Sequence, residues 1–194
     1  MKWILLLLTV VSCTKCPNKA TPFTWETIPG REEIVGIIRP VYRAKVPKDW
    51  VRLDTPKSFT DTKIANATFI IGDKIRLTVH TFPSMHIPPK AQIDRFSGQL
   101  ASSTIKSHGH GGFSGLFLEG DKDENKTLAW AFQLDPELVQ RLAFAAYTTS
   151  EKLYYEQMSA DFTIKVSGEA SLIKEHRANL LQFAHSIELI EEIP

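Results

Sequence analysis

Hydrophobic and polar residues alternate along several short stretches of the chain. Such alternation is typical of β-strands that bury one face. The stretch at residues 158–166 is the clearest, because Phe162, Ile164 and Val166 alternate there with Thr163 and Lys165. Similar stretches lie at residues 127–134, 75–81, 41–46, 67–71 and 113–119. Together they predict a mainly antiparallel sheet of five or six strands.

Other segments repeat hydrophobic residues at the spacing of a helix. The longest covers residues 169–188, and its stripe consists of Ala170, Ile173, Leu180, Leu181, Ala184 and Ile187. A second helix is expected after Pro88 and Pro89, because proline is tolerated in a first turn, and it carries Ile93, Phe96 and Leu100. A third is expected from Asp135, as N-cap, to about residue 147.

This order of elements predicts the fold class. Strands with interspersed helices and a long closing helix indicate an α+β protein, in which helices pack on both faces of the sheet as an α/β/α sandwich. One globular domain is expected over residues 41–194. The length and the hydrophobic content suffice for a core without disulfides.

The first twelve residues are predicted to be an export signal. One basic residue, Lys2, precedes an apolar run that ends at Ser12 and Cys13. The run is too short to span a bilayer, which takes about 20 apolar residues. Residues 10–13, Val-Val-Ser-Cys, resemble the bacterial lipobox. The alternative is an ordinary secretory peptide in which a cysteine occupies this position by chance.

The lipobox resemblance implies a chemistry and a location. The leader would be cut between Ser12 and Cys13, and diacylglycerol would be attached to the Cys13 thiol. Each buried methylene contributes about 0.8 kcal/mol, so two or three acyl chains make a durable anchor. The chain is therefore expected in a bacterial cell envelope, with the membrane as its partner. Thr14, in place of an aspartate, favours the outer membrane if the bacterium is Gram-negative.

Residues 13–40 are predicted to be the lipidated terminus and a tether. The segment is polar and rich in turn residues, including Pro17, Pro22 and Pro29. Phe23 and Trp25 are unusual for a linker. They suggest docking on the domain or at the membrane interface.

Charge and cysteine content exclude two classes of function. The chain has 23 Lys and Arg against 22 Asp and Glu, and loss of Lys2 with the leader leaves 22 of each. A nucleic-acid binder needs a surplus of cations, so none is expected as a partner. Cys13 and Cys16 have the C-x-x-C spacing, but they follow a leader and not a buried strand, which argues against a redox pair. The fate of Cys16 is left open.

The body of the chain resembles the Mog1/PsbP-like fold. The resemblance is carried by Pro47-Lys48-Asp49-Trp50, by residues 160–165, by the turn at Gly168 and by residues 183–187, Phe-Ala-His-Ser-Ile. It covers about residues 41–189. It implies an assembly factor, a binding adaptor or an accessory subunit, and it brings no shared catalytic residues. The segment at residues 107–115, rich in Gly and His, departs from the family pattern.

That segment holds the one local arrangement that suggests chemistry. His108 and His110 are separated by one glycine, and two imidazoles at this spacing can share a metal. Further ligands would have to come from His80, His86 or distant carboxylates. The interpretation preferred from sequence is a Gly-rich hairpin or loop with exposed histidines. No catalytic, metal or cofactor residue is therefore assigned, and no enzyme activity is expected.

Two functions remain open at this stage. The first is a lipid-anchored, non-catalytic binding or assembly module that contacts another envelope protein. The second is a lipoprotein that binds a small ligand or a metal, with residues 108–112 at the mouth of the site.

Overall fold

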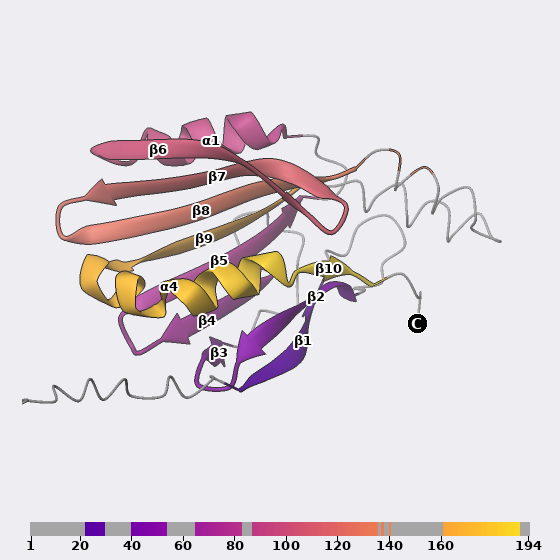
Figure 1. Ribbon diagram of the computed structural model, residues 1–194, viewed down its shortest axis with the longest axis horizontal. Helices are drawn as coiled ribbons and strands as arrows, with labels where there is room; N and C mark the ends of the chain where they lie inside the picture. The colour runs from indigo at the N-terminus through magenta and orange to yellow at the C-terminus, as the bar shows by residue number, and fades with distance from the viewer. Residues whose placement is uncertain are drawn as a thin grey trace, which may run out of the picture.

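The computed structural model describes residues 22–29, 40–53, 65–82, 87–135, 137, 140 and 161–190. Its largest element is a seven-stranded sheet in the order β3-β4-β5-β9-β8-β7-β6, in which every pair of neighbours is antiparallel (Figure 1). The strands are β3 (Val51–Leu53), β4 (Ala67–Ile71), β5 (Ile75–Phe82), β6 (Ser102–His110), β7 (Phe113–Lys122), β8 (Asn125–Leu134) and β9 (Asp161–Glu169).

The α+β class and the antiparallel sheet are confirmed, but the strand number was wrong, since the sheet has seven strands. Two strands of this sheet escaped prediction. β3 is only three residues long, too short for a pattern, and β6 is an edge strand. Residues 102–107 of β6 are all exposed, so no buried face marks them by alternation.

The alternation did identify the central strands. On β8, Leu128, Trp130, Phe132 and Leu134 are all buried, as are Phe162, Ile164 and Val166 on β9. Both strands lie in the middle of the sheet, where each gains neighbours on both sides. Residues 158–160, at the start of the predicted last strand, lie outside the described residues.

Two helices pack on opposite faces of the sheet. α4 (Ala170–His185) covers the larger core, which Ile173, Leu180, Phe183 and Ala184 reach from the helix. α1 (Pro89–Ser97) begins with proline in its first turn, as predicted. Its Ile93 and Phe96 pack against Leu118, Ala129 and Ala131 on the other face. Of the third predicted helix, the structure describes the start, where the Asp135 carboxylate accepts the Glu137 N–H at 2.8 Å. The rest lies outside the described residues.

A second, small sheet consists of β1 (Phe23–Pro29), β2 (Pro40–Pro47) and β10 (Glu188–Leu189) in the order β1-β2-β10. It lies below the seven-stranded sheet in Figure 1. β1 falls within residues 13–40, which were predicted to be a tether. Because Ile28 is fully buried and seven residues of β1 pair with β2, this part of the segment belongs to the folded body.

Candidate functional site

The candidate site lies on the sheet face that carries α1. Alternation along β9 turns Phe162, Ile164 and Val166 toward α4, so Lys165 and Ser167 point to the opposite face. Thr127 of the neighbouring strand β8 shares that face, and its hydroxyl lies 3.4 Å from that of Ser167. On this side α1 packs mainly against β7 and β8, and its end reaches β9, where the Lys165 ammonium lies 5.2 Å from the Phe96 ring centroid. Lys165 and Ser167 of β9 border the stretch of the sheet beyond the end of α1.

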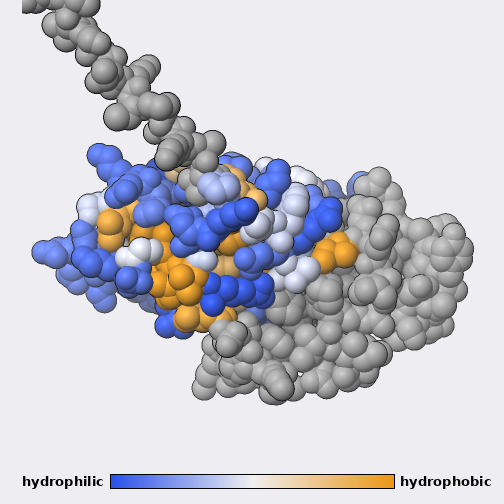
Figure 2. Space-filling view, turned by 90° about the horizontal axis from the view of Figure 1, so that it is seen from below, coloured by the Kyte–Doolittle hydropathy of each residue, from blue (hydrophilic) through white to orange (hydrophobic). Residues whose placement is uncertain are grey.

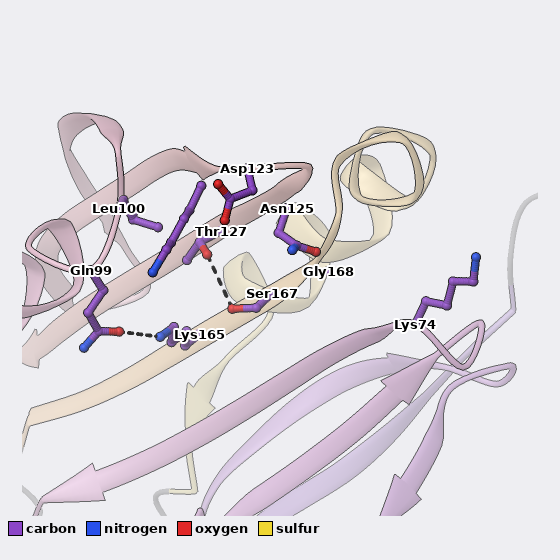
Figure 3. Close-up of a pocket in the computed structure, with 10 residues that line it drawn as sticks. Lys74, Gln99, Leu100, Asp123, Asn125, Thr127, Lys165, Ser167 and Gly168 are labelled. Carbon is purple, nitrogen blue, oxygen red and sulfur yellow. Dashed lines mark hydrogen bonds between the residues drawn. The ribbon is translucent and has the colours of Figure 1, made fainter.

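This stretch forms an open groove of about 660 Å³, a volume within the range of small-molecule sites. Five parts of the chain meet there: the β4–β5 turn, the end of α1, the β7–β8 turn, β8 and β9 (Figure 3). The lining residues are Lys74, Gln99, Leu100, Lys122, Asp123, Asn125, Thr127, Lys165, Ser167 and Gly168.

Lys165 is the most constrained cation of the groove. Its ammonium donates to Gln99 Oε1 at 2.9 Å and lies 5.2 Å from the centroid of the Phe96 ring (Figure 3). Burial lowers the pKa of Lys165, and the nearby positive charge of Arg95 lowers it further. Among the described residues, no carboxylate pairs with Lys165 to offset these two effects. A bound anion would supply that missing charge and reverse the shift.

The other charged residues that line the groove also leave an excess of positive charge. Lys122 forms no ion pair with any described residue. Lys74 lies at the rim (Figure 3) and pairs with Glu169 at 3.3 Å. Asp123 is the one carboxylate in the lining. With Glu169 counted as the partner of Lys74, three lysines stand against two carboxylates, and the one net positive charge favours an anionic ligand.

The uncharged lining residues add hydrogen-bonding groups. The Thr127 and Ser167 hydroxyls and the Asn125 and Gln99 amides can each donate and accept. This combination suits a ligand that carries both negative charge and hydroxyl groups. The lining contains no histidine or cysteine, and its two hydroxyls lie next to each other.

The histidines named from the sequence form a separate cluster, on the α4 face. His108 and His110 of β6 meet His185 at the end of α4, and the rings of His108 and His185 stack with centroids 4.7 Å apart. Phe132 lies against both β6 histidines. The predicted hairpin is confirmed: Gly111 and Gly112, with φ of 54° and 84°, form the two-residue turn between β6 and β7. However, the two β6 histidines are half-buried and not exposed.

Burial sets the protonation of this cluster. It lowers the pKa of His108 and of His110, and the neighbouring histidines add to the effect. The ring of His110 contacts the Ile187 carbonyl oxygen through Nε2 at 3.3 Å, which opposes part of the shift. His108 Nε2 and His110 Nδ1 are buried and have no hydrogen-bond partner among the described residues. The neutral forms of His108 and His110 are therefore favoured.

The metal alternative was tested on this geometry. Within the part of the chain that the structure describes, no group of three or more His, Cys, Asp or Glu side chains is placed to hold a metal ion. His80 cannot join the cluster, because on β5 it alternates with the buried Val79 and so faces the side of α1. His86 lies outside the described residues. The cluster is instead an aromatic contact between the β6–β7 hairpin and α4.

Sequence patterns gave only part of this picture. Cys13 and Cys16 lie outside the described residues. The alternation on β9 did predict that Lys165 faces away from the core. The groove was missed because its lining residues come from five separate segments and form no local motif. One lysine in a turn, one at the end of a strand and one within a strand carry no spacing that a sequence alone would reveal.

Comparisons with known proteins give limited information. No protein-family model and no curated protein matches the chain. The solution structure of cyanobacterial PsbP (CyanoP) from Synechocystis sp. PCC 6803 matches with 13% identity and a TM-score of 0.46, over 77% of this chain and 86% of that one. The crystal structure of LpqN, involved in cell envelope biogenesis of Mycobacterium tuberculosis, matches with 12% identity and a TM-score of 0.46, over 85% and 91%. At these TM-scores neither likeness carries an argument about this chain.

No helix among the described residues has both the length and the hydrophobicity that a transmembrane segment requires.

Proposed function

We propose that this chain is a lipid-anchored, non-catalytic binding module of the bacterial cell envelope, and that the groove beside Lys165 is its ligand site. The ligand class is a small anion that also carries hydroxyl groups. The observation that supports this choice is the charge of the groove, where Lys165 and Lys122 have no carboxylate partner among the described residues and Asp123 is the one carboxylate in the lining. The anchor rests on the lipobox at residues 10–13.

The composition of the groove favours small-ligand binding over metal binding. Lysine is a strong phosphate and carboxylate binder but a poor metal ligand. The open shape of the groove and its two hydroxyl groups suit reversible capture of a soluble molecule. With the domain tethered through Cys13, such capture would take place at the membrane surface.

Calorimetric titration of the purified chain tests the ligand class. Glucose 6-phosphate and inorganic phosphate serve as anionic probes, and glucose is the neutral comparison. Low ionic strength is used because salt screens exposed charges. We expect binding of glucose 6-phosphate, weaker binding of phosphate, and none of glucose.

Variants assign the binding to the groove. Lys122→Ala and Lys165→Met should each weaken binding by about tenfold or more, because each removes a charged contact. Lys106→Ala is the control, since Lys106 is exposed on β6 and does not line the groove. No heat with any anionic probe, or an equal loss with the control variant, would contradict the proposal.

A further inference from the structure

The small sheet presents one exposed tryptophan on its outer face. Tyr42, Ala44 and Val46 of β2 point into the core, so Arg43 and Lys45 point outward. Trp25 of β1 lies opposite Lys45 in the β1–β2 ladder. Its side chain is 48% exposed, and it is the one large hydrophobic residue exposed among the described side chains of β1, β2 and β10.

Two cations sit against this tryptophan. The guanidinium carbon of Arg43 lies 5.0 Å from the ring centroid and the Lys45 ammonium lies 5.1 Å from it. Arg43 also pairs with Glu188 of β10. Lys45 has no acidic partner within the described residues. We call Trp25, Arg43 and Lys45 the Trp25 patch.

The place of the patch in the chain restricts what it can meet. Ten peptide links join Cys13 to Phe23, the first residue of β1. Fully extended, they span at most about 35 Å. If Cys13 carries the lipid, as the proposed function holds, the strand that bears Trp25 stays within this distance of the headgroups. The tether therefore gives the patch a high effective concentration at the bilayer.

We propose that the Trp25 patch docks on the surface of a bilayer that contains anionic lipids. Tryptophan favours the interface between headgroups and hydrocarbon, because its ring is apolar and its N–H is polar. Lysine and arginine beside it can extend to the lipid phosphates while their stems remain against apolar groups. The side of the molecule nearest β1 and β2 mixes hydrophobic and hydrophilic residues, as such a surface requires (Figure 2).

The positive charges of the Trp25 patch argue against a second copy of the chain as its binding partner. Two patches brought face to face would place Arg43 and Lys45 of each copy close to those of the other. A single exposed tryptophan also gives little apolar area, whereas a stable dimer buries on the order of 1,000 Å² or more. A bilayer meets neither difficulty, because its phosphates neutralise the cations.

The test uses the lipidated chain reconstituted in vesicles with brominated phospholipids, which quench nearby tryptophans. After removal of the leader, the chain has Trp25, Trp50 and Trp130. Trp50 and Trp130 are 6% and 0% exposed and act as internal references. We expect quenching in vesicles that contain phosphatidylglycerol and less in vesicles of phosphatidylcholine alone. The Trp25→Phe variant should lose this quenching.

Two further variants test orientation and charge. Lys45→Ala should weaken the lipid-dependent quenching about fivefold, measured as the anionic lipid needed for half-maximal effect, while Lys106→Ala should leave it unchanged. Ile105→Trp in the Trp25→Phe background places a reporter at a position 45% exposed on β6, at the far edge of the main sheet. We expect no lipid-dependent quenching of the tryptophan introduced at this position.

The experiment distinguishes failure of the anchor hypothesis from failure of the docking proposal. Flotation of the chain with vesicles reports the lipid, and quenching in the floated fraction reports docking. A floated chain whose Trp25 is not quenched would overturn the docking proposal and leave the anchor intact. A concentration-dependent blue shift of Trp25 fluorescence without vesicles would also overturn it, because it would indicate a second copy.

Discussion

At the scale of single residues, Lys165 shows how a site differs from a core. Its neighbours on β9, Ile164 and Val166, are fully buried and serve packing. Lys165 is only partly buried, and it lies beside Phe96 and near the positive charge of Arg95. Such a placement disfavours the charged form, so the residue contributes less to folding than an apolar side chain of similar length would.

Lys165→Met is therefore expected to separate stability from binding. The free energy of unfolding should stay the same or rise, because the methionine keeps the contact with Phe96 and removes a desolvated charge. Binding of the anionic probe should weaken in the same protein. Urea unfolding followed by circular dichroism gives the first quantity. A clear loss of stability would show that Lys165 supports the fold and is not held there for a ligand.

At the scale of elements, the contact between the β6–β7 hairpin and α4 depends on neutral histidines. His108 and His110 meet His185 across this contact, and Phe132 forms its floor. Burial lowers the pKa of both β6 histidines in the folded chain. In the unfolded chain the pKa of each of these histidines returns to about 6.5.

The sign of the resulting pH dependence follows from proton uptake. Below about pH 6.5 the unfolded chain binds protons that the folded chain still resists, so stability falls as the pH falls toward the lowered folded pKa. Above this range both states are neutral and the effect is absent. We expect the urea midpoint to drop between about pH 7 and pH 5, and to drop less in a His108→Phe/His110→Phe variant. Equal slopes in both proteins would refute this assignment.

Sequence patterns predicted the elements that bury one face or one stripe. The alternation of Trp130 and Phe132 and the stripe through Ile173 and Leu180 each depend on local spacing, and the structure bears out both. β6 could not be found in this way because an exposed edge strand needs no hydrophobic face. β1 was not predicted because it lies in a segment rich in turn residues. Its pairing with β2 depends on contacts with another segment of the chain, which local spacing does not reveal.

At the scale of the whole molecule, three features have separate roles in the proposed function. The lipid on Cys13 would hold the domain at the membrane, and the Trp25 patch would fix the side that meets the bilayer. The groove lies at the end of α1, on the main sheet, whereas the patch belongs to the small sheet (Figure 1). A ligand could therefore reach Lys165 while the domain is docked.

The groove could not be predicted at any smaller scale. Lys74, Lys122 and Lys165 are brought together only when the β4–β5 turn, the end of β7 and the central strand β9 meet in the folded sheet. Cys13 is the opposite case, because the lipobox is a local motif that the sequence alone displays. The anchor is thus inferred from the sequence and the ligand site from the structure.

Mass spectrometry of the N-terminal peptide from the native protein tests the central claim most directly. The account predicts a chain that begins at Cys13, with the mass of diacylglycerol on its thiol and with the protein in the membrane fraction. A chain that begins with an unmodified residue and is recovered free of membranes would contradict it.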